Sequence, residues 1–145
     1  IRKRHLVLLP LTASCLMLAW NLSFDPIMST LFGCWIWASG GAYFGVPLTN
    51  FAGWLLTTYL FFQLFALLVD RSKTGEDLAG DPVYWQLIPW MYAVQGLPSV
   101  LYAFSGRQGQ EIYRPVAIIT ATAMFLPALI SLIRLRSFDS RPKSG

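Results

Sequence analysis

Asp25 is the residue most able to do chemistry, because it is an acidic side chain within long apolar sequence. Of the seven Asp and Glu residues it alone falls outside the predicted loops and the C-terminal tail, and no Lys or Arg lies near it in the sequence. A carboxyl group kept from water and from cations holds its proton and can act as an acid. A structural role is the alternative, since Asp followed by Pro26 is a common helix start, with Asp as N-cap. The sequence leaves both open.

Four Trp and Tyr side chains follow Asp25 within thirty residues of sequence. They are Trp35, Trp37, Tyr43 and Trp54. Their electron-rich faces could stabilise a carbocation or stack along a polyene. The same residue types also form belts at the headgroup level of membranes, where they anchor the spans. A binding pocket and an interfacial belt are both consistent with the sequence.

Asn50 is the second candidate for a polar catalytic role. It precedes a predicted helix in which Trp54 falls on the same face by helical spacing. Its amide could hold a water molecule beside the reacting group. Asn is also a preferred N-cap residue, so capping alone is the alternative.

The elements that must position these residues are predicted to be membrane helices of a single all-α domain covering residues 1–145. Hydrophobic residues make up 55% of the chain and charged residues 12%. The apolar residues form blocks of the length that crosses a hydrocarbon core. We expect four spans, at residues 5–21, 51–69, 83–104 and 115–134. The fold class is therefore an all-α integral membrane protein.

Between the first two spans, residues 27–39 are too few to cross the bilayer comfortably as a helix. We expect a short re-entrant or interfacial helix there, followed by a loop. Gly40, Gly41 and Gly45 permit backbone angles closed to other residues, and Pro47 fixes its own. Irregular backbone of this kind is expensive in lipid, so it is expected to be covered by protein or to line a cavity.

The distribution of basic residues predicts the orientation of the chain. Nine of the eleven Lys and Arg fall on one side of the four-span topology: Arg2, Lys3, Arg4, Arg71, Lys73, Arg134, Arg136, Arg141 and Lys143. Only Arg107 and Arg114 fall on the other. The positive-inside rule then places both termini in the cytoplasm. Because the basic residues flank membrane segments, we expect no nucleic acid as a partner.

Cys15 and Cys34 are the only cysteines, and each lies in apolar sequence without nearby His or acidic residues. This pattern makes no metal motif. We therefore expect two buried free thiols and no metal site.

The stretches "WNLSFDP" and "WIWASGGAYFGVPLTNFAGW" resemble the membrane-bound carotenoid 1',2'-hydratases, which include the bisanhydrobacterioruberin and γ-carotene hydratases. The similarity is greatest over about residues 20–70, where an Asp-Pro pair, a Trp-x-Trp and a Gly-Gly precede Tyr-Phe-Gly-Val-Pro-Leu. Asn21 stands where the resemblance implies an Asp, four residues before Asp25. Members of this family are usually about twice this length, so the resemblance implies that the chain is the C-terminal part of a longer protein.

The resemblance implies that water adds across the terminal 1',2' double bond of an acyclic carotenoid end group, without a cofactor. Asp25 and Asn50 are then the catalytic residues, and Asn21, Trp35, Trp37, Tyr43 and Trp54 bind the substrate. The expected partners are a carotenoid or another polyene lipid and membrane lipids. The alternative is a non-catalytic subunit that binds carotenoid or lipid among other membrane subunits.

Overall fold

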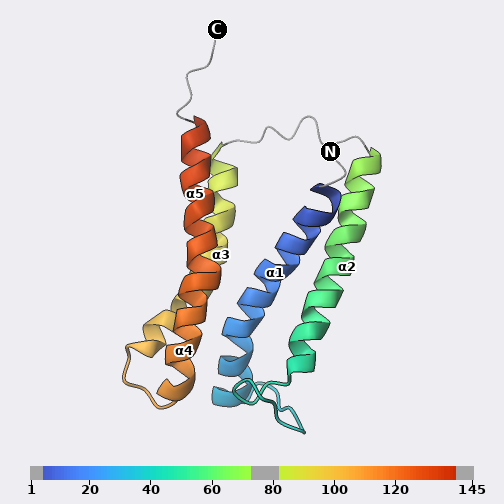
Figure 1. The fold of residues 1–145 in the computed structure, drawn as a ribbon. Helices are drawn as coiled ribbons and strands as arrows, with labels where there is room; N and C mark the ends of the chain where they lie inside the picture. The colour runs from blue at the N-terminus through green and yellow to red at the C-terminus, as the bar shows by residue number, and fades with distance from the viewer. Residues whose placement is uncertain (1–4, 73–81, 140–145) are drawn as a thin grey trace.

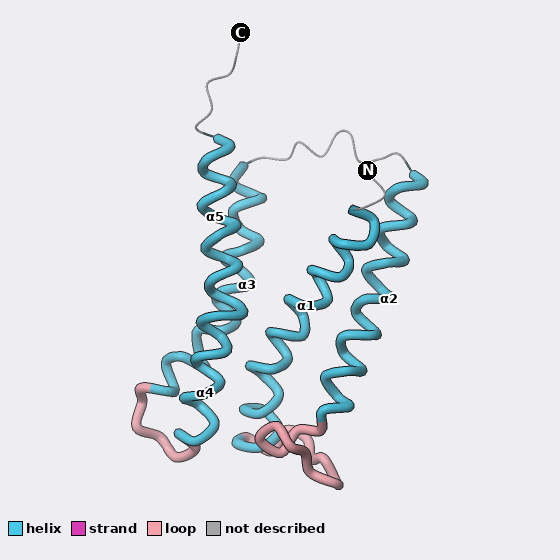
Figure 2. Tube along the Cα trace, viewed as in Figure 1, coloured by secondary structure: helices cyan, strands magenta, loops and turns pink. Residues whose placement is uncertain are grey.

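The computed structural model describes residues 5–72 and 82–139, and this part of the chain is built of helices joined by two loops (Figures 1 and 2). Helix α1 (His5–Asp25) continues directly into the π-helical segment η1 (Pro26–Leu31). Helix α2 (Leu48–Ser72) follows the first loop, and α3 (Pro82–Ala103) lies beyond the residues not described. After the second loop, α4 (Gln110–Thr120), the π-helical segment η3 (Ala121–Phe125) and α5 (Leu126–Asp139) follow one another without a break.

The helices pack as two pairs that meet at one end. Helix α1 lies along α2, and α3 lies along α4 and α5 (Figure 1). The second half of α1 also contacts α4 and η3, which joins the pairs. A cluster of buried side chains fills this junction: Ile27, Ala103, Ile112, Tyr113 and Val116. The core is therefore concentrated at the end of the bundle where both loops lie.

The close contact of α3 with α4 and η3 depends on one glycine. A Cβ atom on Gly96 would lie 2.4 Å from Cγ2 of Thr120 and 3.0 Å from a ring carbon of Phe125. Beside it, the hydroxyl groups of Ser23, Ser99 and Thr120 form a buried hydrogen-bonded cluster that ties α1, α3 and α4 together. Such small polar residues at helix interfaces are typical of membrane helix bundles.

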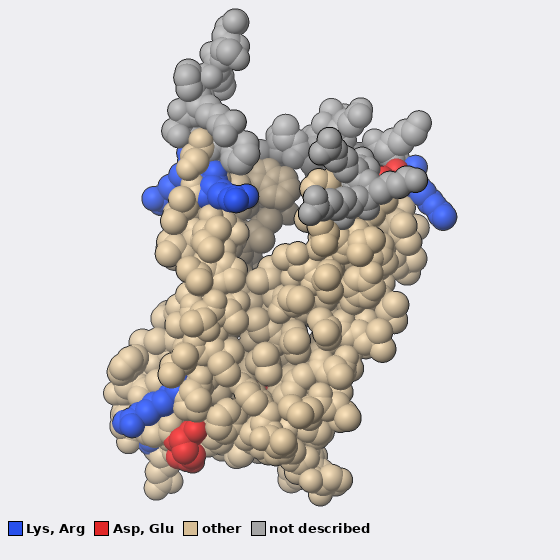
Figure 3. Space-filling model, in the orientation of Figure 1, with Lys and Arg blue, Asp and Glu red and all other residues tan. Residues whose placement is uncertain are grey.

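Three described helical segments are long and apolar enough to cross a membrane: His5–Leu31, Leu48–Arg71 and Gln110–Ser137. On the face shown in Figure 3, charged side chains gather at the two ends of the bundle, and a wide uncharged band separates them. On α2 the large apolar side chains of Leu60, Phe61, Leu64 and Phe65 are exposed, as lipid contact requires. These features identify an all-α integral membrane protein.

The number of passes and the orientation stay predictions. Helix α3 has 22 residues but is not among the three segments, because Gln86, Gln95, Pro89 and Pro98 lower its hydropathy. The start of α1 and the end of α5 lie at the same end of the bundle (Figure 1), as an even number of passes requires. Of the nine basic residues on the predicted cytoplasmic side, three lie in described helices, Arg71, Arg134 and Arg136. The other six lie outside the described residues: Arg2, Lys3, Arg4, Lys73, Arg141 and Lys143.

Two sequence-based expectations were wrong. The short helix expected within residues 27–39 is not a separate re-entrant element: residues 26–31 extend α1, and residues 32–47 form the loop before α2. The predicted absence of helix at Gly40 and Gly41 is confirmed. Cys15 and Cys34 are exposed rather than buried. Apolar sequence around a residue does not imply burial in a membrane helix, because the lipid-facing side is apolar too.

Candidate active site

Asp25 lies inside a continuous helix, so its interpretation as a helix N-cap is wrong. Its backbone angles are helical (φ −59°, ψ −44°), and its side chain makes no capping hydrogen bond. The side chain is 4% exposed. Directly after it the helix widens into the π-helical segment η1, where Ser29 donates a hydrogen bond to the Asp25 carbonyl oxygen at 2.7 Å. Single π-helical turns of this kind occur frequently at functional sites.

Asn50 does not cap α2 either, because its side chain is used across the helix pair. It is the third residue of α2, which begins at Leu48. Its amide nitrogen donates to Oδ2 of Asp25 at 2.5 Å and lies 3.3 Å from Oδ1 of Asn21. Asn21 is 1% exposed and precedes Asp25 by one helical turn. The buried side chains of Asn21 and Asp25 and the half-buried side chain of Asn50 thus form one polar cluster between α1 and α2.

The loop of residues 32–47 folds over this cluster through a tight turn. Tyr43 and Val46 exchange two backbone hydrogen bonds, of 3.2 and 2.9 Å. Phe44 and Gly45 between them both have positive φ, of 47° and 85°, as in the turn types that close two-residue hairpins. A Cβ atom on Gly41 would lie 2.0 Å from the carbonyl carbon of Val46, so no other residue fits there. Gly41 and Gly45 are therefore the glycines that this turn requires.

Tyr43 fastens the loop to both helices. Its hydroxyl donates to the carbonyl oxygen of Leu22 at 3.0 Å, and its ring meets the ring of Phe51 edge-on at 5.2 Å. Burial raises the pKa of Tyr43 to about 12, so the hydroxyl remains a neutral donor at any physiological pH. Tyr43 is not among the residues that line the cleft described next.

A cleft of about 400 Å³ opens beside the polar cluster, a volume within the range of small-molecule sites. Six of the seven predicted site residues line it: Asn21, Asp25, Trp35, Trp37, Asn50 and Trp54. The structure therefore brings the predicted acid, both amides and three of the four predicted aromatic residues to one place.

Three lining residues were missed from the sequence: Trp20, Phe24 and Ile36. The rings of Trp20 and Phe24 stack at 4.8 Å with an interplanar angle of 19°, and Phe24 lies 6.3 Å from Trp35. The sequence contains a signal for two of them. Trp20 and Phe24 are four residues apart, as Asn21 and Asp25 are, and each directly precedes one of these residues, which places them on the neighbouring side of the same helix. The cleft thus has a continuous aromatic wall.

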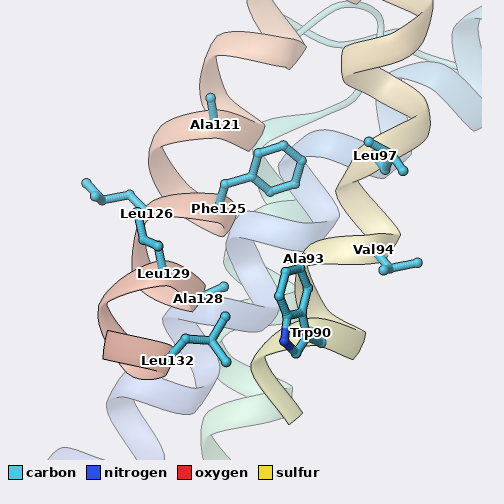
Figure 4. A pocket seen from close by; sticks show the side chains of 10 residues that line it. All are labelled: Trp90, Ala93, Val94, Leu97, Ala121, Phe125, Leu126, Ala128, Leu129 and Leu132. Atoms are coloured by element: carbon cyan, nitrogen blue, oxygen red, sulfur yellow. The ribbon is translucent and has the colours of Figure 1, made fainter. Parts of the chain in front are cut away.

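A larger cavity, of about 500 Å³, lies between α3 and α5 (Figure 4). Trp90, Val94, Phe125 and Leu129 are among its lining side chains, and none of the ten is charged or carries a group that titrates near neutral pH. It offers no acid or base. The smaller cleft at Asp25 is therefore the one that can support proton chemistry.

The cleft at Asp25 combines a carboxyl group, two amides and several aromatic faces. Among the described residues, no three His, Cys, Asp or Glu side chains lie together in a way that could hold a metal ion. A carboxyl group in these surroundings can transfer a proton to a guest in the cleft. The aromatic faces can stabilise positive charge that develops on that guest.

The comparisons with known proteins place the chain in a family. No curated protein and no solved structure matches it. A family model described as carotenoid biosynthesis protein matches residues 2–126, which include both loops, α1 to α4 and every residue that lines the Asp25 cleft. The chain belongs to the carotenoid biosynthesis protein family.

Proposed function

We propose that this protein hydrates the terminal 1',2' double bond of an acyclic carotenoid end group. The observation that carries the proposal is the position of Asp25: a buried carboxyl group on the wall of an aromatic cleft, with amides rather than basic side chains as its partners. The membership in a carotenoid biosynthesis family supports a polyene as the substrate. The reaction needs no redox cofactor, because no electrons are exchanged with another molecule.

In the first step Asp25 protonates the alkene. Asn50 donates its hydrogen bond to Oδ2, which leaves Oδ1 to carry the proton toward the cleft. The proton forms a new C–H bond at C2' from the π electrons of the double bond, and positive charge develops at the tertiary carbon C1'. Asp25 is left as a carboxylate that accepts the Asn50 hydrogen bond.

In the second step water attacks the cation. The ring faces of Trp35 and Trp54 on the cleft wall stabilise the charge at C1' while it exists. The amides of Asn21 and Asn50 lie beside the carboxylate, where they can hold a water molecule. Its oxygen bonds to C1', its extra proton returns to Asp25, and the product is a tertiary alcohol. One alkene and one water are consumed, and the acid is regenerated.

The test is to replace the acid while keeping its shape. Asp25→Asn removes the proton source, and loss of a general acid typically costs about 10² to 10⁴ in rate. Glu111→Gln is the matched control, because it makes the same carboxyl-to-amide change at an exposed residue of α4. Both variants are co-expressed with the enzymes that make an acyclic carotenoid, and the pigments are separated by chromatography. A well-folded Asp25→Asn protein with the activity of Glu111→Gln would refute the acid assignment.

The second candidate function is a non-catalytic subunit that binds carotenoid or lipid in the same cleft. The observation that favours it is the hydrogen-bonded cluster itself, because Asn50 joins α1 to α2 through Asn21 and Asp25 as a purely structural contact would. Under this function the purified protein retains bound pigment that is chemically unchanged, and Asp25→Asn alters its stability but no product yield.

A further inference from the structure

A second cavity, of about 260 Å³, lies on the other side of the aromatic wall of the Asp25 cleft. It is formed by the end of α1, η1 and α3. Phe32, Gln95 and Pro98 are exposed at its edge, so it opens to the outside of the bundle. Nothing in the proposed protonation uses this space.

The two cavities share two residues, Trp20 and Phe24, whose stacked rings line both. On α1 these rings lie between Asn21 and Asp25 on one side and Ser23 and Ile27 on the other, by helical spacing. A linear molecule whose end group sits at Asp25 can therefore leave the cleft across two aromatic faces. Aromatic faces favour the stacking of a conjugated chain.

The chemistry of the second cavity suits a neutral, apolar guest. None of its lining side chains is charged, and Ile27, Phe32 and Tyr102 supply apolar surface. Its two serine hydroxyls are already paired: Ser23 donates to the Ala19 carbonyl at 3.1 Å and accepts from Thr120 at 3.0 Å, and Ser99 lies 2.9 Å from the Thr120 hydroxyl.

We propose that the second cavity binds the conjugated chain of the substrate and that the Trp20–Phe24 pair carries this chain over from the Asp25 cleft. This proposal rests on the proposed function and adds a specificity determinant to it. The second cavity makes the protein select long polyenes over short isoprenoids that carry the same end group, because only a long chain gains the stacking and burial beyond the cleft.

The test compares two neighbouring residues of α3 that point to different cavities. Gln95→Phe puts a ring into the second cavity from an exposed side chain outside the buried hydroxyl cluster. Val94→Phe is the matched control, because Val94 lines the larger cavity between α3 and α5 and the same ring is added there instead (Figure 4). Each variant is given a long acyclic carotenoid and a short isoprenoid with the same end group.

The measured quantity is the ratio of kcat/KM for the long substrate to that for the short one. Gln95→Phe should lower this ratio about tenfold or more, since a blocked aromatic and apolar subsite loses the interactions that distinguish the two. Val94→Phe should leave the ratio as in the wild type. An unchanged ratio in Gln95→Phe, or the larger loss in Val94→Phe, would overturn the proposal.

A binding measurement separates this proposal from the proposed function. The long carotenoid is titrated into purified protein in detergent micelles, and the quenching of tryptophan fluorescence gives Kd. Gln95→Phe should raise Kd about tenfold, whereas Val94→Phe should not. If neither substrate is hydrated, the proposed function fails. The difference in Kd between Gln95→Phe and Val94→Phe still shows whether the second cavity binds the polyene chain. If hydration is intact and Gln95→Phe changes neither quantity, the cavity proposal alone fails.

Discussion

The Asn50 amide is the residue whose removal should reveal most about the site, because it serves two buried acceptors at once. It donates to Asp25 at 2.5 Å and lies 3.3 Å from the Asn21 side-chain oxygen. The two acceptor residues are 4% and 1% exposed, and Asn50 is the residue of α2 that donates to both of them. Asn50→Ala therefore removes the donor of both contacts in one substitution.

The expected cost follows from the two contacts. A buried acceptor left without a donor costs about 1–3 kcal/mol. Loss of the short hydrogen bond to Asp25 should cost an amount at the upper end of that range, and loss of the longer one to Asn21 an amount at the lower end. Together they predict a loss of about 3–4 kcal/mol in the free energy of unfolding. For a chain of this size this loss corresponds to a fall in the unfolding temperature of roughly 5–15 °C.

The assay heats purified protein in detergent micelles and measures, by size-exclusion chromatography, the temperature at which half of the protein is lost from the monodisperse peak. Thr49→Ala is the control, because Thr49 is exposed in the same turn of α2. Hydration by Asn50→Ala should also fall about 10²-fold, since Asp25 loses the contact that orients it. An Asn50→Ala protein that unfolds at the same temperature as Thr49→Ala and keeps its activity would refute this account of the cluster.

Three further changes test how the site is held. Gly41→Ala should prevent the loop from closing, because the new Cβ would meet the Val46 backbone at 2.0 Å; Gly53→Ala, in α2 with open space around it, should be neutral or stabilising by about 0.5–1 kcal/mol when thermal stability is compared. Thr120→Val should cost about 1–3 kcal/mol in the same assay, because Ser23 and Ser99 lose their shared partner; a neutral result would contradict the hydroxyl cluster. Tyr43→Phe should be less stable than the wild type by a margin that is constant below pH 10 and shrinks as the pH rises from 10 toward about 12. The raised pKa of Tyr43 means that folding favours the neutral hydroxyl. Above pH 10 the unfolded chain loses the Tyr43 proton before the folded protein does, so the stabilising contribution of Tyr43 to folding falls; a margin that grows with pH would contradict the assignment.

Much of the site could be predicted from residue types and spacing. Asp25 stands out because an acidic residue in apolar sequence requires partners, and Trp54 falls one turn after Asn50 on the same face. The structure brings these three residues to one cleft. Whether the cleft performs the proposed reaction stays a prediction.

The local roles of the polar residues could not be predicted, because they depend on contacts far apart in sequence. Both Asp25 and Asn50 match the preferences for an N-cap, yet they bond to each other across 25 positions of the chain. Pro26 is normally a sign of a helix start, but a helix can continue through Pro where the turn widens, as η1 does. Tyr43 likewise finds its partner, Leu22, on another element, which no local pattern shows.

The central claim is that Asp25 delivers a proton and that water supplies the oxygen of the product. The most direct measurement is mass spectrometry of the pigment formed by the purified protein in deuterium oxide and, separately, in water labelled with heavy oxygen. If Asp25 is the acid, the product carries one non-exchangeable deuterium at C2' in the first experiment and a labelled hydroxyl oxygen in the second, and Asp25→Asn forms neither product. A product whose hydroxyl oxygen carries no label from water, or the same labelled product in full yield from Asp25→Asn, would contradict it.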